Sequence, residues 1–299
     1  MSHTIIGNHK VQFIGDDTLL EHPGAKKMEN AAWLFNHASG KNVKAHQAVT
    51  TMLHDLDDNT FYPFLVRMYV KKEDAGKSFK TKLQIMQDIL GIAKERFNIV
   101  GKTFDSWYSA KALMDESYVT ELKANRRVST EYMGKMTSKS SYYFLTLDEL
   151  LDVAFIMLKR DSNILGDFPL YRDISAWLSN GEHVNIVMLY NPETGMKKFL
   201  ASDYVSGEDL IREWNNRWPI ENFHNDAKDL GLGEYQVRDC EGSLIHASIT
   251  VTAYTLLSVM IKNSMHLFGK ILKTIGQCSR EIKRVLFFRK NYKSRLFSG

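Results

Sequence analysis

The feature that most constrains the fold is an amphipathic segment followed at once by an apolar one. KTKLQIMQDILGIAKERF, residues 80–97, has apolar residues every three or four positions, which predicts a helix with one buried face. NIVGKTFD, residues 98–105, follows without a linker and reads as a strand that ends at Asp105. A helix that feeds directly into a strand is typical of α/β folds, in which helices cover the faces of a sheet.

The flanking segments extend this pattern over the first 125 residues. Further strands are predicted at 11–21, around 42–53, at 61–70 and at 117–125, and a second helix is expected from Asp105 through Leu113. Residues 126–205 differ in character, because they combine short alternating runs with the hairpin turn NPETG. We interpret them as a partly β insertion within the α/β layer.

The segment WNNRWPIENFHNDAK, residues 214–228, carries the most unusual charge pattern. Arg217, Glu221 and Lys228 lie at i, i+4 and i+11, which places them on one face of a helix. A capping box at 206–209 is predicted to open this helix. A solvated face with i,i+4 ion pairs is the ordinary explanation of such spacing.

Pro219 is expected to kink the helix, and Gly231 or Gly233 suits a left-handed end. Further along, residues 245–261 (IHASITVTAYTLLSVMI) are nearly long enough to span a membrane. His, Ser and Thr interrupt this run and Lys262 follows it, so a buried core helix is predicted.

Composition narrows the functional classes. Hydrophobic residues make up 44% and charged residues 25%, which favours a soluble globular protein. Cys240 and Cys278 lack CxxC or Cys/His spacing, which argues against a disulfide framework or zinc site and favours a reducing, cytosolic compartment. The net charge is +4, yet residues 270–299 hold nine Lys and Arg residues against one acid. Such a segment suits contact with a phosphate backbone or is a solubilising tail.

Three carboxylates stand out by position. Asp17 (or Asp16) and Asp105 follow predicted strands, and Glu221 lies on the late helix. Three converging carboxylates can hold two divalent cations for in-line phosphoryl transfer, and hard oxygen ligands suit Mg²⁺ or Mn²⁺.

The motifs GDDT at 15–18, FDSWYS at 104–109 and W-x2-R-x3-E-x6-K at 214–228 resemble a known family. They are similar to the catalytic core of bacterial insertion-sequence DDE transposases, which carry a Y-x2-R-x3-E-x6-K signature. The resemblance implies an RNase H-like α/β fold, a mixed sheet flanked by helices and interrupted by a partly β insertion before the catalytic glutamate helix. The resemblance divides the chain into a first core part at 1–125, an insertion at 126–205, a second core part at 206–269 and a basic C-terminal segment at 270–299.

The resemblance also implies the roles of individual residues. Asp17, with Asp16 as the fallback, Asp105 and Glu221 would be the catalytic residues and the ligands of two Mg²⁺ or Mn²⁺ ions. The DNA-binding residues would be Trp214, Arg217 and Lys228, with Trp214 in place of the signature tyrosine.

The implied activity is metal-dependent DNA cleavage and strand transfer at transposon ends. The implied partner is double-stranded DNA, bound by a homodimer in the cytoplasm, associated with the nucleoid and not with a membrane. Only 16 residues precede Asp17, where the family usually has a DNA-binding region. The alternatives are therefore a truncated DNA-binding remnant that inhibits a full-length transposase, or an RNase H-like nuclease of unrelated purpose. Trp177 in the insertion is a candidate for stacking on an unpaired base, or for core packing.

Overall fold

A computed structural model describes residues 6–160, 167–263, 266–267, 270–271 and 273–296 of the chain. Among these residues, twelve strands form one sheet and two more form a small ribbon. The strands are β1 (Lys10–Glu21), β2 (Ala32–Asn36), β3 (Lys41–Asp55), β4 (Thr60–Tyr69), β5 (Asn98–Phe104), β6 (Tyr118–Leu122), β7 (Arg127–Ser129), β8 (Leu145–Thr146), β9 (Lys159–Arg160), β10 (Leu170–Leu178), β11 (His183–Tyr190), β12 (Lys197–Ser202), β13 (His266–Leu267) and β14 (Lys270–Ile271). The helices are α2 (Lys72–Ala75), α3 (Lys82–Arg96), α4 (Leu147–Ala154), α5 (Gly207–Asn215), α6 (Trp218–Asp229), α7 (Cys240–Lys262) and α8 (Ile275–Leu296).

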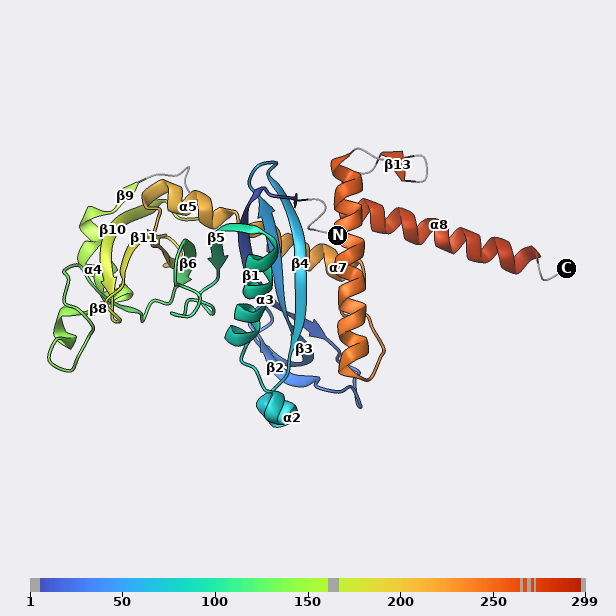
Figure 1. The fold of residues 1–299 in the computed structure, drawn as a ribbon, viewed down its shortest axis with the longest axis horizontal. Coiled ribbons are helices and arrows are strands. Elements are labelled where there is room, and N and C mark those ends of the chain that lie inside the picture. The colour runs from blue at the N-terminus through green and yellow to red at the C-terminus, as the bar shows by residue number, and fades with distance from the viewer. Residues whose placement is uncertain (1–5, 161–166, 264–265, 268–269, 272, 297–299) are drawn as a thin grey trace.

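The first half of the sheet is mixed in direction. Strand β1 pairs antiparallel with β3 on one side and parallel with β5 on the other, and β5 pairs parallel with β6. Strand β3 also pairs with β2 and β4. The α/β class is confirmed, because this mixed sheet flanked by helices is compatible with an RNase H-like fold (Figure 1).

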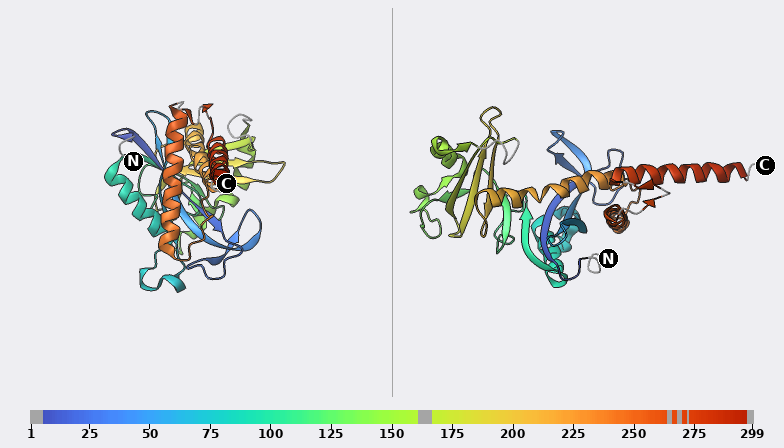
Figure 2. Two further views of the ribbon diagram at one scale, coloured as in Figure 1. Left: turned by 90° about the vertical axis from the view of Figure 1, so that its right-hand side faces the viewer. Right: turned by 90° about the horizontal axis from the view of Figure 1, so that it is seen from above.

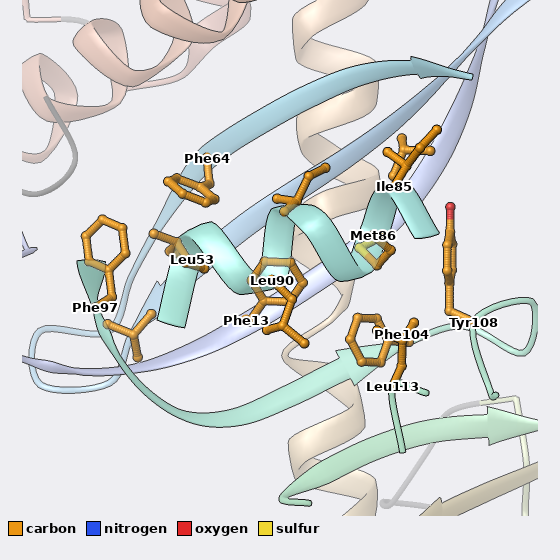
Figure 3. Close-up of a cluster of buried hydrophobic side chains, with 14 of the residues drawn as sticks. Phe13, Leu53, Phe64, Ile85, Met86, Leu90, Phe97, Phe104, Tyr108 and Leu113 are labelled. Carbon is orange, nitrogen blue, oxygen red and sulfur yellow. The ribbon is translucent and has the colours of Figure 1, made fainter. Parts of the chain in front are cut away.

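Helix α3 covers one face of β1, β3, β4 and β5. Its start is fixed by a capping box, in which Thr81 and Gln84 bond each other's backbone amides. Met86 and Leu90 of α3 pack on Phe13 of β1, and Tyr108 lies at the margin of the same cluster (Figure 3). The periodic segment 80–97 thus forms the predicted helix.

Helices α6 and α7 cover the opposite face. Phe223 of α6 and Val251 of α7 belong to one buried cluster with Ile14 and Met52 of the sheet. The rings of Phe223 and Tyr254 meet edge to face, with their centroids 5.0 Å apart. The site described below therefore lies in a strand layer that is packed on both faces.

The segment predicted as an insertion contains β7–β12 and α4, and it extends the same sheet through the β6–β12 pairing. Leu147 and Leu151 of α4 pack on one face of these strands. Leu210 and Trp214 of α5 pack on the other face, against Leu200 of β12. Strands β11 and β12 form the predicted hairpin around NPETG.

Three local predictions are wrong. Residues 105–114 form turns and not a helix, because the Asp105 side chain accepts from the amides of Trp107 and Tyr108, which competes with helical bonding. The single helix predicted from 206 is two helices, α5 and α6, and Pro219 stands in the first turn of the second. Ser206 precedes α5 but makes no side-chain cap there.

Helix α7 is buried along one face only. Ala247 and Val251 are buried, whereas Ile249 is 63% exposed. By length and composition this helix is apolar enough to cross a membrane, as the core helix of a soluble protein also is. Helix α8 extends away from the body of the molecule in Figure 1 and in the right-hand view of Figure 2.

Candidate active site

Two adjacent aspartates of β1 direct their carboxylates to different partners. Asp16 is bound by Arg217, with Nη1 2.8 Å from Oδ2. Asp17 accepts from Lys82 Nζ at 3.0 Å, from the Tyr108 hydroxyl at 3.1 Å and from the Gln47 amide. The two side chains thus reach different partners, as the alternation of side chains along a strand requires.

Asp105 joins this pair because β5 runs parallel to β1. Gly15 of β1 pairs with Phe104 of β5, so Asp105 follows its strand directly beside Asp16. Asp105 Oδ1 accepts from the amides of Trp107 at 3.1 Å and Tyr108 at 3.4 Å, which fixes the carboxylate at the rim of the sheet. Two of the sequence-predicted positions are thus brought together by strand pairing.

Arg217 connects Glu221 to the strand acids. It stands in the break between α5 and α6, and its guanidinium bridges Asp16 and Glu221. The Asp16, Arg217 and Glu221 side chains are 15%, 12% and 33% exposed. Arg217 Nε is buried with no hydrogen-bond partner among the described residues. The fallback residue Asp16, and not Asp17, therefore shares an ion-pair network with Glu221.

Burial and mutual repulsion raise the pKa values of two of the carboxylates, Asp16 and Asp105. Burial, followed by the nearby charge of Asp105, raises the pKa of Asp16 to about 7, although Arg217 opposes the shift. Burial and the charge of Asp17 likewise raise the pKa of Asp105. Burial and the same negative charges raise the pKa of the Tyr108 hydroxyl, which keeps it a donor to Asp17. Neighbouring carboxylates that disfavour their own ionisation form a site that a cation would stabilise.

The remaining predicted DNA-binding residues occupy different environments. Trp214 is only 4% exposed and packs under Arg217, whose guanidinium carbon is 4.9 Å from the ring centroid. Lys228 is exposed on α6, 11 residues from Arg217, which is about 16 Å along a helix axis. Trp214 therefore supports the arginine, and Lys228 lies too far away to act at the same phosphate.

Sequence reasoning missed the residues that hold Asp17 and the strand backbone in place. Lys82 opens α3, 65 positions from Asp17, and no local pattern links the two. His224, one turn after Glu221, is buried and bonds Thr50 at 2.6 Å; burial lowers its pKa to about 3. The position of Tyr108 within the FDSWYS motif was the only signal available for this set.

Among the described residues, one group of three potential metal-ligating side chains has its ligand atoms all within 4.8 Å of one another. This group is His9, Asp55 and Asp57. Asp55 pairs with Val11, five positions before Asp16 on β1, which is about 17 Å away at 3.3 Å per residue. The carboxylate oxygens of Asp16, Asp105 and Glu221 are therefore further apart than the ligand atoms of that group.

A mixed sheet compatible with an RNase H-like fold, with carboxylates at neighbouring strands and on the covering helix, is the arrangement that the resemblance to DDE transposases implies. Residues 1–269 match the family model described as archaeal putative transposase ISC1217, and the chain belongs to this family. No curated protein matches the chain. The family description is archaeal, so the predicted bacterial origin and the exact form of the signature are not confirmed.

Membership of a transposase family implies a protein that binds and processes DNA. Such proteins typically use a divalent metal. Asp16, Asp105 and Glu221 offer the hard oxygen ligands that Mg²⁺ and Mn²⁺ prefer. A cation bound here would stabilise the ionised carboxylates and so lower the raised pKa values of Asp16 and Asp105.

Proposed function

We propose that the chain is the catalytic core of a metal-dependent DNA transposase that cleaves and joins strands at the ends of its own element. The catalytic carboxylates in this proposal are Asp16, Asp105 and Glu221. Asp17, which the sequence favoured, instead orders the site through Lys82 and Tyr108. The observation that carries the proposal is the Arg217 bridge from Asp16 to Glu221 beside Asp105.

Each residue has a role that follows from its position. Asp16 lies on β1 and Asp105 directly follows the paired strand β5, so the sheet fixes their separation while Glu221 approaches from α6. Ions bound by these carboxylates would polarise phosphate oxygens and activate the attacking water or 3′-hydroxyl. Arg217 presents a planar fork that can exchange a carboxylate for a phosphate, and its donors then hold the scissile group in line.

A cleavage assay with matched variants tests the assignment. The substrate is a duplex that carries the inverted repeats flanking the element, incubated with the full chain and Mg²⁺ or Mn²⁺. Asp16→Asn, Asp105→Asn and Glu221→Gln should each reduce cleavage at least about a hundredfold, as loss of a transition-state electrostatic contact does. DNA binding in EDTA should persist, because each change removes negative charge near phosphate.

Asp17→Asn is the matched control, because it alters the neighbouring position on the same strand. It should retain cleavage at a reduced rate. Full cleavage by Asp16→Asn, together with loss in Asp17→Asn, would return the role to Asp17. Binding without cleavage in the parent chain would favour the alternative, a DNA-binding remnant that inhibits a full-length transposase. A homodimer on DNA, acting in the cytoplasm, belongs to the same proposal, and light scattering of the DNA complex tests the dimer.

A further inference from the structure

Strands β2 and β3 form a two-stranded ribbon at the end of the sheet where β1 finishes (Figure 1). Strand β1 pairs with β3 as far as Glu21, which lies opposite Ala45, and residues 41–45 of β3 pair with β2. The turn of the ribbon is closed by Asn36, whose side-chain oxygen accepts from two backbone amides of the turn. The Asn36 amide group also donates to Glu21 at 2.7 Å, so the ribbon is an ordered projection that is tied to the end of β1.

The strand register places one face of this ribbon on the side of the sheet that carries Asp16. Asp16 lies opposite Thr50 of β3, and side chains alternate along a strand, so Lys44, six residues before Thr50, lies on the same face. Trp33 lies opposite Lys44, and Phe35 follows on that face two residues later. Six residues at about 3.3 Å each put Lys44 about 20 Å from Thr50, a length of about six base pairs of B-DNA.

Two large aromatic side chains are exposed on this face. Trp33 is 67% exposed and Phe35 is 51% exposed, although large aromatic side chains are usually mostly buried. Among the described residues, no other ring and no cation lies over the Trp33 ring, and Phe35 meets the edge of the His37 ring with the centroids 4.9 Å apart. The two rings therefore form an apolar surface that nothing in the described part of the chain covers.

Positive charge surrounds these rings. Residues 31–45 contain Lys41 and Lys44 and no Asp or Glu. Lys41 is exposed and Lys44 is half-buried, and neither forms an ion pair with a described residue. Asn42, exposed opposite Phe35, adds an amide that can both donate and accept. Rings and an amide that are flanked by lysines suit a DNA groove better than an apolar protein surface, because a groove offers base edges between two lines of phosphates.

Helix α6 leads from the candidate active site towards the ribbon. It begins beside the strand acids, and Gly233, just after its end, packs against Leu20 of β1. Two residues further on, the Tyr235 hydroxyl lies 2.6 Å from Nδ1 of His46 at the base of the ribbon. Lys228 in the last turn of α6 therefore lies at the same end of the sheet as the ribbon. A duplex that follows α6 away from the candidate active site reaches the ribbon next.

We propose that the β2–β3 ribbon enters the major groove of the duplex that flanks the scissile phosphate, about six base pairs away. The major groove is about 12 Å wide and admits a two-stranded ribbon. Trp33 and Phe35 contact base edges, the thymine methyl group among them, while Lys41 and Lys44 contact the phosphates on either side. This inference rests on the proposed function, because it takes the ligand to be the DNA on which that site acts.

Binding of the inverted-repeat duplex in EDTA tests the ribbon with the full chain. Trp33→Ala and Phe35→Ala, made together, should weaken binding about tenfold, because two exposed aromatic surfaces no longer become buried on the DNA. Lys41→Ala and Lys44→Ala should each lower the salt dependence of binding by about 0.9 units of slope. Methylation of guanine N7, in the major groove, should interfere with binding about six base pairs from the end of the element, whereas methylation of adenine N3, in the minor groove, should not.

Lys10→Ala is the matched control. Lys10 is exposed at the opposite end of β1, 11 positions from Glu21, so its loss should leave affinity and salt dependence unchanged. Interference at adenine N3 alone, or parent-like binding by the double variant and both lysine variants, would overturn the inference. If the double variant folds poorly in thermal unfolding, the two lysine variants carry the same test.

Two further outcomes separate this inference from its alternatives. A double variant that binds DNA as the parent does, but has a lower mass in light scattering without DNA, would make the ribbon an interface between two copies and overturn the inference. Because binding is measured without metal, a chain that binds through the ribbon and fails to cleave supports the ribbon and refutes the cleavage in the proposed function. A chain that cleaves while all ribbon variants bind as the parent does refutes only the ribbon.

Discussion

Asp16→Asn should stabilise the metal-free protein, and the gain should grow with pH. Asp16 has its folded-state pKa raised from 3.8 to about 7, mainly by burial. Below pH 3.8 the carboxyl is protonated in both the folded and the unfolded chain and contributes no difference. As pH rises towards 7 the unfolded chain releases the proton first, so the parent loses stability over this window. Asparagine has no proton to lose.

The magnitude follows from the shift. About three pKa units at 1.36 kcal/mol each give an upper value of about 4 kcal/mol, and about 2–4 kcal/mol is expected at pH 8. For a chain of this size that corresponds to about 3–6 °C in melting temperature. Thermal unfolding of parent and variant in EDTA at pH 5 and pH 8 measures it. A difference that is the same at both pH values would refute the reasoning.

Two comparisons make the result specific to Asp16. Asp17→Asn removes the partner of Lys82, whose side chain is 12% exposed, so it should cost about 1–3 kcal/mol at both pH values. Added Mg²⁺ should raise the melting temperature of the parent by mass action and leave that of Asp16→Asn nearly unchanged. A parent chain indifferent to Mg²⁺ would argue against a metal at this site.

Two other expectations concern DNA and packing. Arg217→Ala and Lys228→Ala should each reduce the salt dependence of duplex binding by about 0.9 units of slope. Only Arg217→Ala should also abolish cleavage. An unchanged slope in both variants would show that α6 does not contact the DNA. Gly15→Ala should destabilise the fold by about 1–3 kcal/mol in urea unfolding, because its Cβ would lie 2.6 Å from the buried Met86 side chain; a neutral result would show that Met86 moves aside.

The sequence predicted those parts of the fold that local periodicity determines. The amphipathic segment 80–97 and the strand after it form as expected, because the spacing of their apolar residues indicates which side chains are buried. The turns at 105–114 were not predictable from the apolar pattern, which indicated a helix. The Asp105 side chain accepts hydrogen bonds from the backbone amides of Trp107 and Tyr108, and this contact depends on the local fold. Likewise, Trp214 matched a motif position, and its burial against β12 depends on distant packing.

The choice between Asp16 and Asp17 illustrates the same limit at the site. Alternation along a strand shows that the two side chains diverge but not which of them meets helix α6. That choice depends on α6 packing on one face of the sheet and α3 on the other, which places Arg217 against Asp16 and Lys82 against Asp17. Both contacts join residues that are remote in sequence, so they cannot be predicted from one sequence alone.

The break between α5 and α6 sets how the chain can meet DNA. Because Arg217 stands in the break, its guanidinium reaches back to Asp16 while Glu221 follows one helical turn later. Lys228 lies about 16 Å further along α6, and B-DNA rises 3.4 Å per base pair, so the two cations span about five base pairs. If both contact one duplex, α6 must follow the backbone away from the scissile phosphate. Phosphate-ethylation interference centred on two clusters about five base pairs apart would fit this geometry, and a single cluster would contradict it.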